Sequence, residues 1–154
     1  MIIREHIETD FLKLAELMRV ADNRSEEWAH NRINSYLRKK PFQTILVAEE
    51  NNQLLGYVGI KILEDENQQT RDILGEKLAS LACLTWIGVH PNFRKRGIAA
   101  ELLAACESWI KAFKTGIWLD CREKMLPFYE KVGYSAAGKY LDDGYDRHVL
   151  VKLI

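Results

Sequence analysis

The sequence predicts a mixed α/β fold in which a central sheet is partly parallel. Two turn signals, Asn51-Asn52-Gln53 and Asp142-Asp143-Gly144, each lie between β-rich runs and predict antiparallel hairpins. Between them, residues 82–121 read as an apolar strand, a basic loop, a helical stretch and a second strand. A crossover of this kind is right-handed and joins parallel strands, so we expect one parallel pair in the sheet.

The first half of the chain is expected to form one strand, two helices and a hairpin. A short strand at Ile2–Arg4 precedes Thr9 or Asp10, either of which can cap a helix, and Ser25 can cap a second helix. Apolar residues then recur on one face of each helix, and two β-rich runs follow. These positions are Leu14, Leu17, Met18 and Ala21 in the first helix, Trp28, Ile33, Tyr36 and Leu37 in the second, and Thr44–Glu49 and Leu54–Leu63 in the hairpin.

The second half is expected to alternate strands with helices and to end in a hairpin. Residues 64–80 begin as a polar loop and end as a short helix, because apolar residues from Ile73 onward recur at helical spacing. A strong apolar stripe from Ile98 to Phe113 predicts a longer helix, with Gly116 just beyond it as a stop signal. The remaining elements are strands at Ala82–Val89, Gly116–Cys121, 134–141 and 145–153, and a short helix over Lys124–Val132 closed by Gly133.

Length and composition bound the fold and the classes of function. The chain has 154 residues, enough for one domain over 1–154, and its 22 acidic and 22 basic residues balance at a pI near 6.9. No global charge draws it to nucleic acid or to an anionic membrane, and no apolar run reaches the roughly 20 residues of a membrane span. The N-terminus lacks a signal-peptide pattern, which makes the cytoplasm the default location. Monomer and homodimer both stay open.

The cysteines and histidines give no indication of a metal site. Cys83, Cys106 and Cys121 show neither paired nor metal-ligand spacing, and all three fall in apolar segments. His148 lies on the last expected strand without a matching set of ligands. We therefore expect reduced thiols in the core and no bound metal.

Residues 84–99 are the most informative segment, because they run from an apolar strand through a proline and a basic loop into a helix. Backbone N–H groups at a helix start have no partner inside the helix, and the helix dipole adds positive potential there. A phosphate can bind such a place, and Gly97 allows close approach of the backbone. The alternative is a solvated basic turn. A Walker loop is excluded, because the chain contains no Gly-x-x-x-x-Gly-Lys-Ser/Thr run.

Three segments resemble the GCN5-related N-acetyltransferase (GNAT) superfamily. The run Arg94-Lys95-Arg96-Gly97-Ile98-Ala99 matches the superfamily pattern of Arg or Gln, two residues, Gly, one residue, then Gly or Ala. Val89-His90-Pro91 resembles its strand exit, and residues 128–134 resemble its helix with a tyrosine before a terminal aromatic residue. With the order of elements, the resemblance covers nearly the whole chain. It implies the GNAT fold, with a mostly antiparallel sheet, a splayed parallel pair and about four flanking helices.

The resemblance implies acetyl-CoA as a co-substrate and locates its contacts. The pyrophosphate would lie against the loop and helix start, and the pantetheine arm would insert beside the splayed strand. The charges of Arg94, Lys95 and Arg96 would add a modest attraction to the phosphates. The implied contacts are Ile87, Gly88 and Val89 in the strand, Arg94, Lys95, Arg96, Gly97, Ile98 and Ala99 in the loop and helix start, and Arg122 and Tyr129 farther along.

The same resemblance assigns two catalytic groups. Tyr129 would act as the general acid that protonates the departing CoA sulfur, since a tyrosine held within hydrogen-bond reach can donate to a developing thiolate. From the sequence alone, Tyr129 reads equally well as an amphipathic core residue beside Phe128. The backbone N–H of Val89 would donate to the oxyanion formed on the thioester.

The general base and the acceptor site are less defined. The strand position at which some members carry a glutamate falls on Cys83, with Thr85 two residues on, and neither is a good base. Arg122 stands where many members have an asparagine, and it is expected to pair with Asp120, to reach an acidic substrate or to stay solvated. Acidic residues near the expected acceptor groove are consistent with a cationic amine, or with solvated loops. The expected bases are Asp120, Glu49, Glu64 and His148, and the acidic residues are Glu26, Glu27, Glu64, Asp65 and Glu66.

The sequence thus predicts an N-acetyltransferase that moves an acetyl group from acetyl-CoA to a primary amine by direct attack in a ternary complex. The amine belongs to a small molecule, a peptide or a protein. The alternative is a non-catalytic domain that binds acyl-CoA as a sensor or as a partner-dependent module, because the strand carboxylate is absent. A nucleic-acid module built on Arg94 to Arg96 fails on the neutral net charge and the lack of interleaved aromatic residues.

Overall fold

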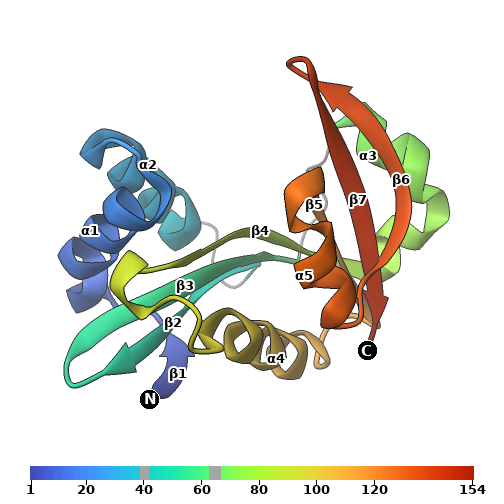
Figure 1. The fold of residues 1–154 in the computed structure, drawn as a ribbon. Coiled ribbons are helices and arrows are strands. Elements are labelled where there is room, and N and C mark those ends of the chain that lie inside the picture. The colour runs from blue at the N-terminus through green and yellow to red at the C-terminus, as the bar shows by residue number, and fades with distance from the viewer. Residues whose placement is uncertain (39–41, 63–66) are drawn as a thin grey trace.

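The computed structural model describes residues 1–38, 42–62 and 67–154, and there the chain forms a seven-stranded mixed sheet with helices on both faces (Figure 1). The strand order is β1-β2-β3-β4-β5-β7-β6, and among these strands β4 and β5 form the parallel pair. The predicted α/β class with one parallel pair is confirmed. The strands are β1 (Ile2–Glu5), β2 (Gln43–Glu50), β3 (Gln53–Lys61), β4 (Leu81–Val89), β5 (Gly116–Arg122), β6 (Ser135–Asp142) and β7 (Tyr145–Leu153).

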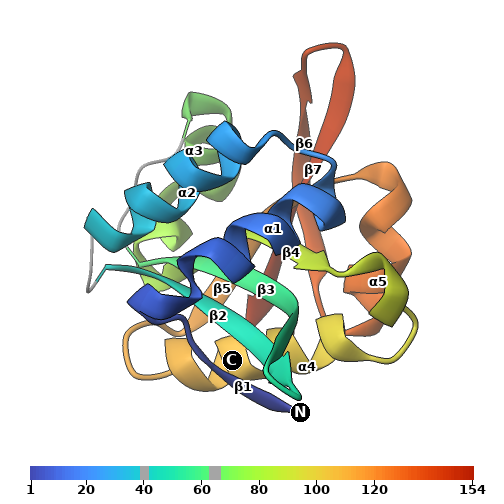
Figure 2. The same ribbon diagram turned by 90° about the vertical axis from the view of Figure 1, so that its left-hand side faces the viewer.

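The helices divide between the two faces of the sheet. The α-helices are α1 (Phe11–Asp22), α2 (Glu26–Arg38), α3 (Gln68–Leu74), α4 (Ile98–Ile110) and α5 (Leu126–Lys131), and the 3₁₀ helices are η1 (Glu8–Asp10), η2 (Gly75–Ser80), η3 (Pro91–Phe93) and η4 (Glu123–Met125). α4 and α5 cover one face, whereas α1 and α2 lie on the other (Figure 1). Figure 2 shows α1 crossing in front of β3 and β4.

The alternation of side chains along each strand produces three apolar clusters. In β5, Ile117, Leu119 and Cys121 pack under α4 and α5, whereas Trp118 faces the opposite side. In β2, neighbouring residues likewise join clusters on opposite faces. Both faces of the central strands are therefore buried, which explains why β2 and β3 read as nearly continuous apolar runs rather than alternating ones.

Both predicted hairpins are present, and their turns explain why. Asn51 and Asn52 adopt φ values of 51° and 63° between β2 and β3, and Asp143 and Gly144 adopt 50° and 81° between β6 and β7. Two successive residues with positive φ form the turn whose twist matches paired antiparallel strands, and Asn, Asp and Gly tolerate that conformation. The predicted end of the first hairpin, Leu63, lies outside the described residues.

One helix cap and two helix boundaries differ from the sequence prediction. Asp10 occupies the N-cap position of α1, but its carboxylate turns back to accept from the Ile7 N–H at 2.8 Å and from Arg4 at 2.7 Å. α4 ends at Ile110, so the stripe that continues to Phe113 belongs to a turn. The predicted helix over Lys124–Val132 divides into η4 and α5, because the fixed φ of Pro127 favours a new helix start. The Ser25 cap is confirmed, with its Oγ accepting from the Trp28 N–H.

The three cysteines, all among the described residues, form no disulfide and are buried, as predicted. Burial raises the pKa of the Cys121 thiol to about 11, so it stays protonated at neutral pH. Among the helices that the structure describes, none has the length and hydrophobicity needed to cross a bilayer.

Candidate active site

The loop between β4 and α4 presents a row of unused backbone donors. Lys95 and Gly97 adopt φ values of 63° and 80°, which turn the chain so that residues 94–99 precede and open α4. Within the described residues, none of the N–H groups of residues 94–99 donates a hydrogen bond to the protein. A Cβ on Gly97 would meet nothing within 4 Å, so the loop faces open space. The loop can therefore hold an anion such as a phosphate against its backbone.

The side chains of the basic loop are not equivalent. The Arg94 guanidinium donates to the Val89 carbonyl at 3.1 Å and to the Ala21 carbonyl at 2.9 Å, so it joins the end of β4 to the end of α1. Arg96 lies 3.5 Å from Glu50 and over the Phe93 ring, and its side chain is half exposed. Arg94 is thus occupied by backbone groups of the protein, whereas Arg96 remains close to solvent.

In the last residues of β4, the backbone donors alternate between β3 and the open side of the strand. The His90 N–H bonds to the Leu55 carbonyl at 2.8 Å, and hydrogen-bonded and non-hydrogen-bonded pairs alternate back along an antiparallel ladder. By this alternation the Gly88 backbone pairs with Tyr57 in β3, whereas the N–H groups of Ile87 and Val89 point away from β3. The neighbour on that side is β5, which pairs with β4 over Leu81–Cys83 alone.

The separation of β4 from β5 creates the β4–β5 pocket. Its lining residues are Leu84, Thr85, Trp86, Ile87, Leu103, Leu119, Asp120 and Tyr129. Tyr129 projects from α5 and its side chain is 6% exposed, yet its hydroxyl makes no hydrogen bond within the described parts of the chain. Burial raises the pKa of Tyr129 to about 12, with smaller contributions from Cys121 and Asp120. At neutral pH the pocket therefore contains a protonated hydroxyl that is free to donate.

A β-bulge in β4, which the sequence analysis did not predict, lies at the same place. The register between β3 and β4 shifts between Val58 and Ile60, so Thr85 and Trp86 together oppose Gly59. The Thr85 hydroxyl contacts the Tyr36 hydroxyl, and a Cβ on Gly59 would lie 2.8 Å from that tyrosine oxygen. The glycine is the one local signal for the bulge, because a glycine inside a strand often marks a bulge or a close approach.

Of the expected bases, Asp120 lines the β4–β5 pocket. It lies next to Leu119 and Cys121, which face α5, so by strand alternation its side chain approaches from the face opposite to Tyr129. Burial raises the pKa of the Asp120 carboxyl above its usual range, although Arg147, 3.7 Å away, and the Tyr140 hydroxyl, 3.3 Å away, oppose this shift. The two titratable groups therefore meet the pocket from opposite faces of the sheet.

The other expected bases lie elsewhere or outside the described residues. Glu49 forms an ion pair with Arg4 at the β1–β2 edge. His148 sits in β7 opposite Cys121, and its buried Nε2 has no hydrogen-bond partner among the described residues. Glu64 lies outside the described part of the chain, as do Asp65 and Glu66.

Arg122 does not form the ion pair with Asp120 that was one of its expected roles. That carboxylate lies beside Arg147 instead. Arg122 is exposed at the end of β5, and its guanidinium lies over the Tyr145 ring at 4.4 Å from the ring centroid. The cross-strand partner of Arg122 is Arg147, so two cations meet at this end of the β5–β7 ladder.

A comparison of the sequence with models of known protein families identifies the family of this chain. Residues 4–134 match the model of the acetyltransferase (GNAT) family, which is most of the chain. The chain belongs to this family. The predicted membership is thereby confirmed, and no curated protein sequence matches the chain.

Solved structures of GNAT proteins share the fold over almost the entire chain. One neighbour is a putative GNAT acetyltransferase from Desulfovibrio desulfuricans, with a TM-score of 0.78, 17% identity and coverage of 99% of this chain and 98% of that chain. An aminoglycoside 6'-N-acetyltransferase complexed with coenzyme A gives a TM-score of 0.78 at 18% identity, covering 99% and 97%. The Enterococcus faecium aminoglycoside 6'-N-acetyltransferase gives 0.76 at 18% identity, also over 99% and 97%. At these identities the likeness shows the fold alone.

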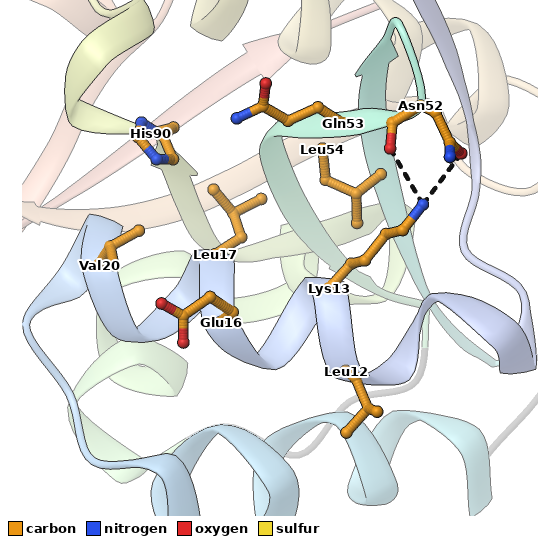
Figure 3. A pocket seen from close by; sticks show the side chains of 9 residues that line it. All are labelled: Leu12, Lys13, Glu16, Leu17, Val20, Asn52, Gln53, Leu54 and His90. Atoms are coloured by element: carbon orange, nitrogen blue, oxygen red, sulfur yellow. Dashed lines mark hydrogen bonds between the residues drawn. The ribbon is translucent and has the colours of Figure 1, made fainter.

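A second pocket of this GNAT chain, of about 430 Å³, lies between α1, the β2–β3 turn and His90 (Figure 3). Its lysine, Lys13, donates to the Asn52 carbonyl and side chain at 3.0 Å, so it closes one end rather than facing the pocket freely. It shares no lining residue with the β4–β5 pocket. In residues 1–38, 42–62 and 67–154, no group of three or more His, Cys, Asp or Glu side chains is arranged to hold a metal ion.

Proposed function

We propose that this protein is an acetyl-CoA-dependent N-acetyltransferase that acts on a primary amine by direct attack in a ternary complex. One observation carries the proposal: the unpartnered Tyr129 hydroxyl lines a pocket whose other wall, β4, has unpaired N–H groups at Ile87 and Val89. A strand-like pantetheine arm can pair with such an edge, as an added β-strand does. Family membership supports the acetyltransferase reaction, and a coenzyme A complex of a fold neighbour supports the donor.

The backbone of residues 94–99 would hold the pyrophosphate of the donor. Those N–H groups have no partner within the described protein, and the dipole of the thirteen-residue α4 adds positive potential where they lie. Lys95 and Arg96 would add a screened charge attraction, since both are exposed. Arg94 would instead fix the loop through its bonds to Val89 and Ala21.

The donor supplies an activated acetyl thioester, and the side chains of this protein manage protons around it. Asp120 would accept a proton from the amine, directly or through water, and its raised pKa makes it a stronger base than an ordinary aspartate. The Val89 N–H would donate to the carbonyl oxygen on which negative charge develops. As the new N–C bond forms and the C–S bond breaks, the Tyr129 hydroxyl would donate its proton to the departing sulfur. Burial also raises the pKa of the departing CoA thiol. The pKa of that thiol and the pKa of the Tyr129 hydroxyl therefore lie closer together.

Calorimetric titration with acetyl-CoA tests the donor site, and two glycines offer a matched pair of variants. Gly97 and Gly144 have φ values of 80° and 81°, and a Cβ on either would meet nothing within 4 Å. Alanine at each therefore brings a similar strain of about 1 kcal/mol. We expect micromolar binding that weakens about tenfold in Gly97→Ala, a change of about 1.4 kcal/mol, and is unchanged in Gly144→Ala. Equal effects of the two substitutions would contradict the site.

Turnover separates the enzyme from a non-catalytic acyl-CoA sensor. Release of free thiol from acetyl-CoA in the presence of a panel of amines supports the enzyme. Binding of acetyl-CoA without thiol release for any amine supports the sensor. The absence of binding at millimolar acetyl-CoA overturns both.

A further inference from the structure

Arg32, on α2, is stacked against aromatic residues beside the proposed site. Its guanidinium carbon lies 3.8 Å from the centroid of the Trp86 ring and 5.1 Å from that of Trp28. The two indoles meet edge to face at 6.2 Å, and Tyr36 packs against Trp86 at 5.4 Å. The aromatic neighbours thus hold the planar guanidinium in a defined position.

This guanidinium has no anionic partner. Within the described residues, the side chain of Arg32 forms no ion pair and donates no hydrogen bond. Arg32 is half-buried, and burial lowers its pKa, which means that its charge is partly removed from water. By contrast, the guanidinium groups of Arg4 and Arg147 lie beside carboxylates. A partly desolvated cation without a partner is costly, and an anionic ligand offsets that cost.

The position of this group connects it to the acceptor side of the site. Trp86 belongs to the β4 bulge and lines the β4–β5 pocket together with Asp120. α2 packs on the face of the sheet opposite to α4 and α5, so Arg32 and Asp120 lie on the face that Tyr129 does not occupy. Figure 1 shows α2 and the β6–β7 hairpin rising from this face on either side of β4.

Charged groups of both signs lie near Arg32. A second cation, Arg24, lies 5.1 Å from the Trp28 ring centroid. The nearby Asp22 accepts a hydrogen bond from the Tyr57 hydroxyl, and burial raises the pKa of its carboxyl. Glu26 is exposed and lies 3.6 Å from His30, at the start of α2.

We propose that the acceptor is an amine that also carries an anionic group, a carboxylate or a phosphate, which Arg32 binds while the amine faces Asp120. This inference rests on the proposed function and names the substrate class of that site. It separates this protein from the aminoglycoside acetyltransferases among its fold neighbours, because aminoglycosides are polycations, which the unpaired Arg32 repels.

Matched pairs of amines test this substrate class in the thiol-release assay. Phenylalanine is compared with phenylalaninamide, and phosphoethanolamine with ethanolamine, so that each pair differs in one anionic group; an aminoglycoside is the cationic probe. We expect at least one of the two anionic amines to exceed its neutral counterpart at least tenfold in kcat/KM, since a hydrogen bond to a charged group contributes about 1.5–3 kcal/mol. The pair that responds distinguishes a carboxylate from a phosphate. Faster turnover of the neutral or cationic amines overturns the proposal.

Variants assign the preference to Arg32. In Arg32→Gln we expect the preference to disappear through a higher KM, with kcat within about twofold and acetyl-CoA binding unchanged; Arg32→Lys should restore part of it. The matched control is Arg19→Gln on α1, an exposed arginine already paired with Glu16 at 2.7 Å, which should change nothing. A preference that survives in Arg32→Gln contradicts the role of Arg32.

Binding of the amines can be measured independently of turnover, so the acceptor site and the proposed reaction are tested separately. The same amines are titrated calorimetrically into the protein saturated with CoA. If the protein binds the anionic amine and Arg32→Gln does not, the acceptor site is supported even when no thiol is released. In that case the proposed reaction fails, and the acceptor site does not. Equal binding of the anionic and neutral amines overturns the acceptor site even where the enzyme turns over.

Discussion

The two sides of the proposed site are built in different ways. The donor side consists mainly of backbone groups from one continuous segment, β4 through the start of α4, in which the N–H groups of Ile87, Val89 and residues 94–99 have no partner among the described residues. The acceptor side consists of side chains from separate elements: Arg32 on α2, Trp86 on β4 and Asp120 on β5. The donor side therefore needs little from side-chain identity beyond Gly97 and Tyr129, whereas the acceptor side can change with a single substitution.

Tyr129→Phe is expected to have the largest effect, because it removes the one side-chain proton donor on the donor side. General acid catalysis contributes about 10²–10⁴ in rate, so kcat should fall at least 10²-fold while the acetyl-CoA dissociation constant stays the same. Steady-state kinetics and calorimetry measure the two quantities. Tyr134→Phe is the matched control, since its buried hydroxyl also lacks a partner among the described residues but does not line the β4–β5 pocket. A drop of similar size in both variants would contradict the assignment.

Asp120→Asn should have the next largest effect, and it tests the acceptor side. The base must be ionised, and burial raises the pKa of Asp120, so kcat/KM should rise with pH as that carboxyl loses its proton. Asparagine cannot titrate, so we expect activity lowered about 10- to 100-fold and the loss of that acidic limb from the pH–rate profile. The control is Asp142→Asn, which removes the other carboxylate beside Arg147, at 3.5 Å, but lies away from the pocket. An acidic limb that persists in Asp120→Asn would show that another group is the base.

Arg94→Ala and Arg96→Ala should have the smallest effects. They test whether the loop of residues 94–99 binds acetyl-CoA through its backbone N–H groups or through the charges of its side chains. Arg94 loses two hydrogen bonds to carbonyls, so we expect the free energy of unfolding to fall by about 1 kcal/mol. The Arg96 guanidinium makes one long contact with Glu50. Loss of this contact should change the free energy of unfolding by less than about 0.5 kcal/mol. Denaturant unfolding measures both. Each variant should weaken acetyl-CoA binding less than Gly97→Ala does, and a larger loss would assign the site to charge.

The helix start at the proposed donor side could be predicted from the sequence because its determinants are local. Gly97 before an apolar helical stripe predicts a helix start, and α4 begins at Ile98, directly after Gly97. The strands and hairpins followed from β-rich runs and from turn residues such as Asn52 and Gly144, which lie in the two turns with positive φ. Local signals were weaker where tertiary contacts compete, as at Asp10, whose carboxylate binds Arg4 rather than capping α1.

The acceptor side could not be derived in the same way. Arg32 and Trp86 are 54 positions apart in the sequence and become neighbours through the packing of α2 on the sheet. The bulge at Trp86 depends on the register between β3 and β4, which Gly59 signals but does not specify. Asp120 was one of four expected bases, and the separation of β4 from β5 distinguishes it from Glu49 and His148. Sequence periodicity carries no information about such contacts.

Amide hydrogen exchange, resolved residue by residue with and without saturating acetyl-CoA, tests the donor side most directly, because backbone donors escape side-chain mutagenesis. We predict that acetyl-CoA slows exchange at residues 94–99 and at Ile87 and Val89, whose N–H groups face away from β3. The Gly88 amide, which pairs with Tyr57, and the turn at Asp143 and Gly144 should not change. Unchanged exchange at residues 94–99 with the protein saturated would contradict a donor site built from these backbone groups.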